Sequence, residues 1–305
     1  MKVKKWLVEF WRQRELQSMV LPGVLFIIVF NFIPIYGLII AFKNFTVMDT
    51  FATAPWVGLD NFRIIWADQF FWQAVWNTLA ISLLKLLVGF LIPIALAIMI
   101  FELRPGRFKK SVQTISYMPY FLSWIVLGGM LISWLSTQGL LNSILSGLGF
   151  NIQWQNWLLS LRAYWWIAVL SDIWKNAGWG TILYLATLAK IDPTYYEAAR
   201  IDGASRMQQI TKITVPMLGP IIALNLMLTI AGLLNSNFDQ TMVLMNPQNQ
   251  ARAEIINTYV FRMGIAQGDF SYATAVGLGI SIVSTILLVI SNRMTKSFND
   301  NTSVL

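Results

Sequence analysis

The chain has 305 residues, of which 56% are hydrophobic and only 12% are charged. A soluble domain carries about twice that share of charged residues, so the composition predicts that much of the chain lies in a lipid bilayer. The absence of cysteine and histidine excludes disulfides and thiolate metal sites, and it removes the commonest general base. The net charge of +8 is better explained by Lys and Arg that hold cytoplasmic loops in place than by nucleic-acid binding, so we expect no nucleic-acid partner.

Six apolar segments are long enough to cross the hydrocarbon, which takes about 20 helical residues. They are Met19–Phe42, Ala74–Phe101, Val112–Leu135, Tyr164–Leu188, Pro216–Leu234 and Ala273–Ser291. The first segment is too long and too far from the N-terminus for a cleaved signal peptide. The sequence therefore predicts an all-α membrane protein with a basic tail over residues 1–18, a six-span domain over residues 19–291 and a second tail over residues 292–305.

The distribution of positive charge predicts the orientation of these spans. Of the 22 Lys and Arg residues, 15 lie in the two tails and in the loops after the second and fourth segments, whereas five lie in the alternate loops. Because positive charge accumulates on the cytoplasmic side, both termini should be cytoplasmic. The first tail also contains Trp6, Phe10 and Trp11. It is either a simple topology anchor, which we favour, or an amphipathic helix on the membrane surface.

The cytoplasmic loop over residues 189–215 has the pattern of two short helices joined by a turn. Asp192 is a good N-cap, and Pro193 suits the first helical position. Gly203 can adopt the positive φ at which a helix ends, and we expect the second helix near Ala204–Thr211.

Four large side chains in this loop have no evident role in a segment surrounded by solvent. They are Tyr195, Tyr196, Ile201 and Met207. With the small alanines, which let a partner approach closely, they indicate a docking face for another protein. The residues alone leave open a second reading, in which the loop folds back on its own protein. Glu197 and Arg200 are three residues apart and can form an ion pair.

The same loop resembles the signature loop of permease subunits in binding-protein-dependent ABC importers. The family pattern is Glu-Ala-Ala, three residues, Gly, nine residues, Ile, one residue and Leu-Pro. This chain has Glu197-Ala198-Ala199, Gly203, Ile213 and Pro216 at that spacing, with Val215 in place of Leu. In that family the loop is a coupling helix that docks on an ATPase subunit. The resemblance implies this role for Glu197, Ala198, Ala199, Asp202, Gly203, Ile213 and Pro216.

Further segments look like carbohydrate-uptake permeases of the maltose type, closest to those for pectic (rhamnogalacturonan) or aldouronate oligosaccharides. They include YMPYFLSWIVLGGMLISWL at 117–135, FDQTMVLMNP at 238–247 and NTYVFRMGI at 257–265. The resemblance implies the type I ABC importer permease fold in the plasma membrane of a bacterium. It also implies four kinds of partner: a second homologous permease, two ATPase subunits, an extracytoplasmic solute-binding protein and an oligosaccharide substrate.

The chain carries no machinery for chemistry of its own. No phosphate-binding loop of the form GxxxxGK[ST] occurs, so ATP hydrolysis is supplied by another subunit or the transport is not driven by ATP. No Ser-His pair or metal cluster is available either, which argues against an enzyme. We therefore expect no cofactor on this chain, and ATP and Mg²⁺ only on the partner ATPase.

Polar residues inside spans mark candidate solute contacts, because polar groups are costly in hydrocarbon. Trp rings stack on the apolar faces of sugars, while amides and charges bind hydroxyls. In maltose-type permeases the sugar is held near the middle of the fourth and fifth spans. By that resemblance the first candidates are Trp174, Asn176, Trp179 and Asn237, followed by Lys85, Lys175, Asn225, Asn235 and Asp239.

Several of these polar residues have a structural alternative. Asp172 can pair with Lys175 or Asn176 on its own helix, and Asn225 can form an interhelical hydrogen bond. Lys85 has no acid within one turn, so it either faces the cavity or pairs with an acid from another helix. If Lys85 or Lys175 faces the cavity unpaired, we expect an acidic oligosaccharide as the solute.

Other functional classes remain as alternatives. One is a permease for a different class of solute. An ion-coupled secondary transporter would need carboxylates or broken helices near the middle of the membrane, and Asp172 is the only acid clearly inside a predicted span. A membrane scaffold without a solute path would not need the polar groups of the fourth and fifth spans.

Overall fold

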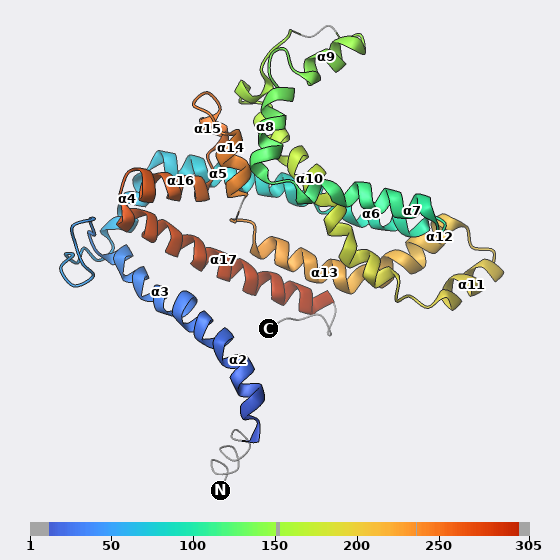
Figure 1. Cartoon of the computed structure of the whole chain (residues 1–305), viewed down its shortest axis with the longest axis horizontal. Helices are drawn as coiled ribbons and strands as arrows, with labels where there is room; N and C mark the ends of the chain where they lie inside the picture. The colour runs from blue at the N-terminus through green and yellow to red at the C-terminus, as the bar shows by residue number, and fades with distance from the viewer. Residues whose placement is uncertain (1–11, 151–152, 236, 299–305) are drawn as a thin grey trace. The chain divides into compact units, whose positions relative to one another are not determined.

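The computed structural model describes residues 12–150, 153–235 and 237–298 (Figure 1). Within these residues the chain is helical, and strand pairing is limited to an isolated bridge between Lys43 and Trp56. The all-α class expected from the sequence is confirmed. The N-terminal aromatic residues Trp6, Phe10 and Trp11 lie outside the described residues.

The α-helices follow one another along the chain, with 3-10 or π-helical turns between several of them. They are α2 (Arg14–Ile27), α3 (Ile33–Ile35), α4 (Asp60–Ala67), α5 (Gln69–Leu84), α6 (Leu91–Glu102), α7 (Arg107–Tyr117), α8 (Trp124–Trp134), α9 (Leu140–Gly147), α10 (Tyr164–Leu188), α11 (Pro193–Ile201), α12 (Arg206–Gln209), α13 (Val215–Ala231), α14 (Phe238–Leu244), α15 (Gln250–Ala253), α16 (Ile256–Phe261) and α17 (Phe270–Phe298). The last helix continues past residue 292, where the sequence predicts the start of the second tail.

The chain divides into two compact units. The first comprises residues 1–67 and 262–279, and the second comprises residues 68–261 and 280–305. In the first unit the loop after the long N-terminal helix is held by Asn61, whose side-chain amide donates to the carbonyls of Ala41 and Lys43 at 2.8 and 3.0 Å.

The second unit contains the residues that build the candidate site, and α10 is its central element. This helix contacts α5, α6, α7, α13 and the turn at residues 118–121. Close contact with α7 depends on Gly178, because a Cβ atom there would lie 1.8 Å from the carbonyl oxygen of Ser116. Small residues of this kind let helices approach closely in a membrane.

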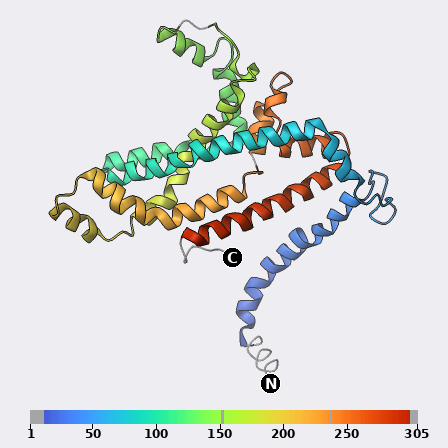
Figure 2. The same cartoon turned by 180° about the vertical axis from the view of Figure 1, so that it is seen from behind.

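Among the described residues, four helices are long and apolar enough to cross a membrane. They span Arg14–Phe42, Gln69–Glu102, Arg206–Ala231 and Phe270–Arg293, and Figure 2 shows the second of them as the continuous run of α5 into α6. They correspond to the first, second, fifth and sixth expected spans. The other two expected spans are helical but differ from the prediction.

The third expected span is broken. Arg107–Phe121 and Trp124–Trp134 meet at an angle of 96°, and they count as a fifth span only if the bent pair crosses together. The fourth, α10, is 25 residues long and thus long enough to cross. It is not among the four helices that are apolar enough to cross, because Asp172, Lys175 and Asn176 lie in its middle.

Prolines explain why three of the long helices contain a π-helical turn. Each of these turns includes the residue four positions before a proline. The turns are Ile28–Phe32, Lys85–Gly89 and Ile210–Thr214, and the prolines are Pro34, Pro93 and Pro216. Proline has no N–H for the carbonyl four residues back, and its ring clashes with that carbonyl. The helix widens by one residue there and then continues.

Candidate solute pathway and coupling loop

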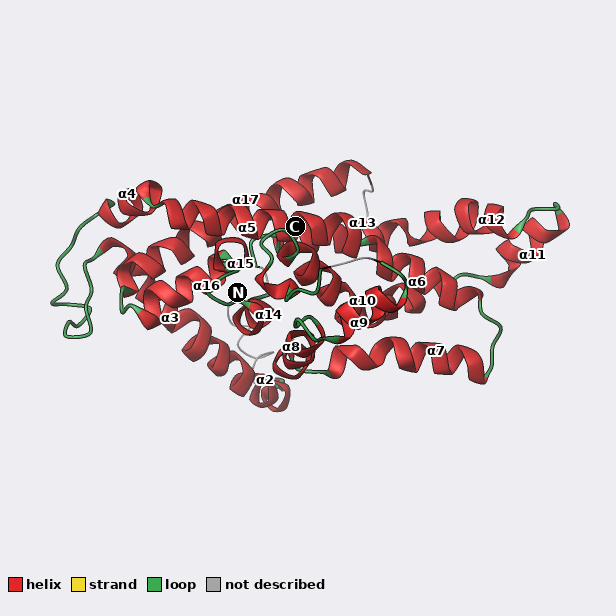
Figure 3. Ribbon diagram, turned by 90° about the horizontal axis from the view of Figure 1, so that it is seen from above, coloured by secondary structure: helices red, strands yellow, loops and turns green. Residues whose placement is uncertain are grey.

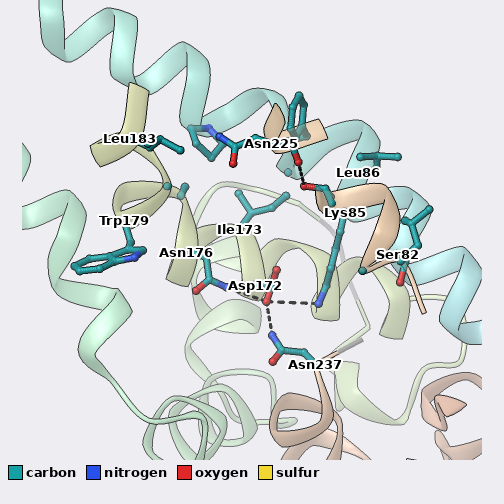
Figure 4. A pocket seen from close by; sticks show the side chains of 18 of the residues that line it. Ser82, Lys85, Leu86, Asp172, Ile173, Asn176, Trp179, Leu183, Asn225 and Asn237 are labelled. Atoms are coloured by element: carbon teal, nitrogen blue, oxygen red, sulfur yellow. Dashed lines mark hydrogen bonds and ion pairs between the residues drawn. The ribbon is translucent and has the colours of Figure 1, made fainter. Parts of the chain in front are cut away.

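A cavity of about 880 Å³ opens in the second unit between α5, α6, α10 and the segment that joins α13 to α14 (Figure 4). Its polar lining residues are Ser82, Lys85, Asp172, Asn176, Tyr184, Asn225, Thr229, Asn235 and Asn237. The rest of the lining is mostly apolar and includes Trp179. A mainly apolar wall with a few polar groups is typical of small-molecule sites, whose volumes run from about 300 to 1,000 Å³.

Asp172 is the centre of a polar network on the cavity wall (Figure 4). Its Oδ1 accepts hydrogen bonds from the side-chain amides of Asn176 at 3.0 Å and Asn237 at 2.5 Å. The same oxygen lies 3.5 Å from Lys85 Nζ, which also donates to Gln240 Oε1 at 3.1 Å. The network connects the second span, α10 and the start of α14. Pairing compensates two charges that would each be costly at this depth.

Gln240 is a member of this network to which the sequence assigned no role. Its side chain is buried, and Nε2 donates to the Ala168 carbonyl at 2.7 Å and to Ser171 Oγ at 2.8 Å. Its place in the sequence could have indicated this role, because its amide lies one helical turn after the candidate residue Asn237. Gln240 thus gives the Lys85 ammonium a second partner besides Asp172.

Lys175 does not line the cavity. The residue is buried, and Nζ donates to the carbonyls of Tyr120 and Leu122, each at 2.6 Å. The ammonium also lies over the rings of Tyr120 and Trp124, at 5.3 and 5.8 Å from the ring centres. These carbonyls belong to the break before α8, where helical hydrogen bonding is interrupted. Lys175 therefore binds the backbone of the broken span.

The structure shows which of the expected partners the two lysines have. Lys85 pairs with an acid from another helix, and the alternative pair between Asp172 and Lys175 is absent from the ion pairs of the described residues. The expected contact between Asp172 and Asn176 is present. Since neither lysine faces the cavity unpaired, the condition on which we expected an acidic solute is not met by this chain.

Asn225 forms the interhelical hydrogen bond that was one of its two predicted roles, and its contact with a solute stays a prediction. Its side-chain amide donates to Tyr184 Oη at 3.3 Å, which joins α13 to α10, and the residue also lines the cavity. A polar side chain that bridges two helices at the cavity wall can exchange that bond for one to a solute.

The two candidate tryptophans differ in position. Trp179 lines the cavity and is stacked on Tyr120, with ring centres 4.4 Å apart and an interplanar angle of 5°. Trp174 is 48% exposed and is not part of the lining. Asp239 is exposed and also lies outside the lining, whereas Asn235 belongs to it.

The loop between α10 and α13 contains the expected pair of helices, α11 and α12, which lie beyond the ends of α6 and α7 (Figure 3). The carboxylate of Asp192 accepts from the Thr194 N–H at 2.9 Å, and this hydrogen bond lowers the pKa of Asp192 below its ordinary value. Gly203 has a φ of +76°, as the turn requires.

The second helix of the loop differs in its bounds from the expectation of Ala204–Thr211. It begins at Arg206 because Ser205 and Gln208 form a capping box in front of it. It does not end at Thr211, since it passes through the π-helical turn into α13.

The loop presents an outward face and is also attached to its own protein. Tyr195, Ile201 and Met207 are exposed, Ile201 by 87%. Tyr196 points inward, and its hydroxyl lies 3.1 Å from Thr214 Oγ1. The reading in which the loop folds back on its own protein therefore holds for Tyr196, and the docking face stays a prediction for the other three residues.

An ion pair of 2.7 Å between Arg206 and Glu102 ties the loop to the end of the second span. The predicted pair between Glu197 and Arg200 is absent from the ion pairs of the described residues.

The signature residues of the loop surround a hollow of about 380 Å³. Four of them line it: Ala199, Asp202, Gly203 and Ile213. Glu197 and Ala198 are exposed on α11, and Pro216 is exposed near the start of α13. All seven motif residues are thus at least partly exposed, and four of them share the hollow.

Comparison with known proteins identifies the family. Residues 89–303 match the family described as binding-protein-dependent transport system inner membrane component. The chain belongs to this permease family. The permease is 36% identical over 300 residues to the polygalacturonan/rhamnogalacturonan transport system permease protein YteP of Bacillus subtilis (strain 168), covering 98% of this chain and 93% of YteP. Over 298 residues it is 37% identical to Protein LplB of the same organism, covering 96% and 92%.

A solved structure is similar over nearly the whole permease. It is a chain of a bacterial alginate ABC transporter in complex with alginate pentasaccharide-bound periplasmic protein, with a TM-score of 0.89, 34% identity and coverage of 97% of this chain and 98% of that one. The permease fold expected from the loop motif is confirmed. The chain is a membrane-embedded transport subunit and not an enzyme.

Proposed function

We propose that this permease forms half of the translocation path of an ATP-driven oligosaccharide importer, with the cavity beside Asp172 as part of that path. The observation that carries the proposal is the combination, in one unit, of a polar-lined cavity and a surface hollow lined by residues of the signature loop. Relatives whose names specify polygalacturonan/rhamnogalacturonan and alginate transport support a saccharide derived from a polysaccharide as the substrate.

The permease works in a complex. Its partners are a second homologous permease, two ATPase subunits that bind ATP and Mg²⁺, and an extracytoplasmic solute-binding protein. A periplasmic protein is present in the similar alginate structure, which supports the last of these. The permease lies in the bacterial plasma membrane with both termini cytoplasmic, because 15 of its Lys and Arg residues lie on that side.

The mechanism is alternating access driven through the coupling loop. ATP binding closes the paired ATPases, moves the loop patch and opens the cavity outward, and hydrolysis returns it to the inward state. ATP shifts this equilibrium only by binding the two states differently. The patch is Glu197, Ala198, Ala199, Asp202, Gly203, Ile213 and Pro216.

Cavity residues contact the solute. Asn176, Asn225, Asn235 and Asn237 offer amide donors and acceptors for sugar hydroxyls, and Trp179 offers an aromatic wall. Lys85 also lines the cavity, but its charge is paired with Asp172, so it acts on the solute by holding that carboxylate. Trp174, Lys175 and Asp239 are not included among these contacts, because they lie outside the lining.

Uptake by a reconstituted complex tests the proposal. The permease, the second permease and the ATPase subunit are placed in proteoliposomes with the solute-binding protein, and uptake of labelled oligosaccharides is measured with and without ATP. We expect uptake that requires ATP, and the ATPase should copurify with the permease. Uptake driven by a proton or sodium gradient without any ATPase would favour a secondary transporter and overturn the proposal.

A further inference from the structure

Given the function proposed above, on which this step rests, we infer that Asp172 is a specificity residue that binds sugar hydroxyls. This half of the cavity would thus select a neutral sugar unit over one that carries a carboxylate. The geometry of the Asp172 carboxylate supports this inference. Two amides and one ammonium all lie against the same oxygen, Oδ1. Oδ2 has no hydrogen-bond partner among the residues that the structure describes, and Asp172 lines the cavity with 18% of its side chain exposed.

The carboxylate is held in place before any solute arrives. Asn176 comes from its own helix, whereas Asn237 and Lys85 come from other segments, and Gln240 fixes Lys85 in turn. A side chain held by several partners loses little conformational freedom on binding, so its remaining acceptor is available at low entropic cost. A carboxylate used only as a structural anchor would need no acceptor left open to a cavity.

The charge balance determines which solute fits. Among the described lining residues, Lys85 and Asp172 are the charged ones, and they compensate each other. An ionised carboxylate accepts hydrogen bonds and cannot donate them, so Oδ2 suits a donor such as a sugar hydroxyl. Bonds to an ionised acceptor are the stronger kind. A solute carboxylate brought to the same place would meet a like charge in a medium of low dielectric constant.

Two variants separate hydroxyl binding from charge. Asp172→Asn has the same shape and keeps an oxygen for Asn176 and Asn237, but it replaces the cavity-facing acceptor by an NH₂ donor and leaves Lys85 uncompensated. Asp172→Asn combined with Lys85→Gln removes both charges. Asp60→Asn, on the exposed helix α4, is the matched carboxylate-to-amide control.

The probes are galactotetraose and tetragalacturonic acid, which have the same length and differ in the group at C6. Uptake of each is measured in the reconstituted complex at equal permease content. For each protein we take the ratio of the two uptake rates and compare the variant with the wild type. The binding protein is the same in both, so its own preference cancels in this comparison.

We expect Asp172→Asn to lower galactotetraose uptake about tenfold or more, the usual effect of losing a charge-assisted hydrogen bond, and to shift the ratio toward tetragalacturonic acid. The double variant should keep the loss with a smaller shift, because it lacks the uncompensated positive charge of Lys85 that Asp172→Asn leaves in the cavity. Equal loss of both solutes in Asp172→Asn, or no loss, would overturn the inference and leave the proposed function standing. A wild-type complex that takes up neither solute with ATP would overturn the proposed function itself.

Discussion

Lys175 illustrates how a charged residue within a predicted membrane span can be bound by the backbone of its own protein. Its charge and depth made it a candidate solute contact, yet the ammonium is bound by two backbone carbonyls of the neighbouring broken span. Those carbonyls lack helical partners and would otherwise be unsatisfied in a medium without water. At the residue scale, Lys85 is also a charged residue within a predicted span, but its partner is Asp172 at the cavity.

Replacing Lys175 by Met should destabilise the permease without changing its solute preference. The change leaves two partly buried carbonyls without donors, and we expect the free energy of unfolding to fall by roughly 2–4 kcal/mol. Thermal unfolding of the purified permease in detergent measures it, with the exposed Lys212→Met as the control. A stable Lys175→Met protein whose apparent affinity for oligosaccharide falls would instead place Lys175 in the solute site.

At the scale of elements, the second unit depends on close packing along α10. Its C-terminal half is packed through Tyr184 and Leu188 against Ala97 of α6 and Leu218 of α13 in one buried cluster. On the face toward α7, Gly178 allows the backbone of Ser116 to approach α10 directly. This contact lies beside the carbonyls that Lys175 binds, so helix contact and charge hold the broken span together.

Gly178→Ala should therefore be strongly destabilising. The added Cβ would lie 1.8 Å from the Ser116 carbonyl oxygen, and relief of the clash requires movement of backbone, at a cost of about 1–3 kcal/mol or more. Gly219→Ala in α13 is a matched control, because nothing lies within 4 Å of its added Cβ, and it should be neutral or stabilising. Equal melting temperatures for the two variants would contradict this account of the helix contact.

At the scale of the whole molecule, the permease combines the cavity with the signature loop, for which we propose the coupling role. Both lie in the second unit and share continuous helices: α13 contributes Asn225 to the cavity and continues from α12 of the loop. The Arg206–Glu102 ion pair ties the loop to the helix that also carries Lys85. A force applied to the loop thus has a short helical path to the cavity wall.

Changes in the coupling patch should abolish ATP-driven uptake while the permease still reaches the membrane. Gly203→Pro forces φ to about −65° at a residue whose φ is +76°, and Glu197→Lys reverses an exposed charge on α11. Uptake and membrane content are measured together, with Lys190→Gln on the same loop as the control. Full uptake in both variants would remove the loop from the mechanism.

The sequence by itself determined the features that depend on neighbours along the chain. Four of the six spans follow from the length of apolar segments, and the start of α11 follows from Asp192 and Pro193. Gly203 and the coupling motif are equally local. These features can be predicted without a tertiary structure because a helix cap and an apolar segment each depend on residues that are neighbours along the chain.

Only the tertiary structure decided which polar groups meet. The pairing of Lys85 with Asp172 and the binding of Lys175 by backbone carbonyls both join segments distant in sequence. Two lysines within predicted spans have different partners, because a buried charge is bound by whichever acceptor the packed helices bring within reach. That choice is a property of the packing and is not encoded in any single segment.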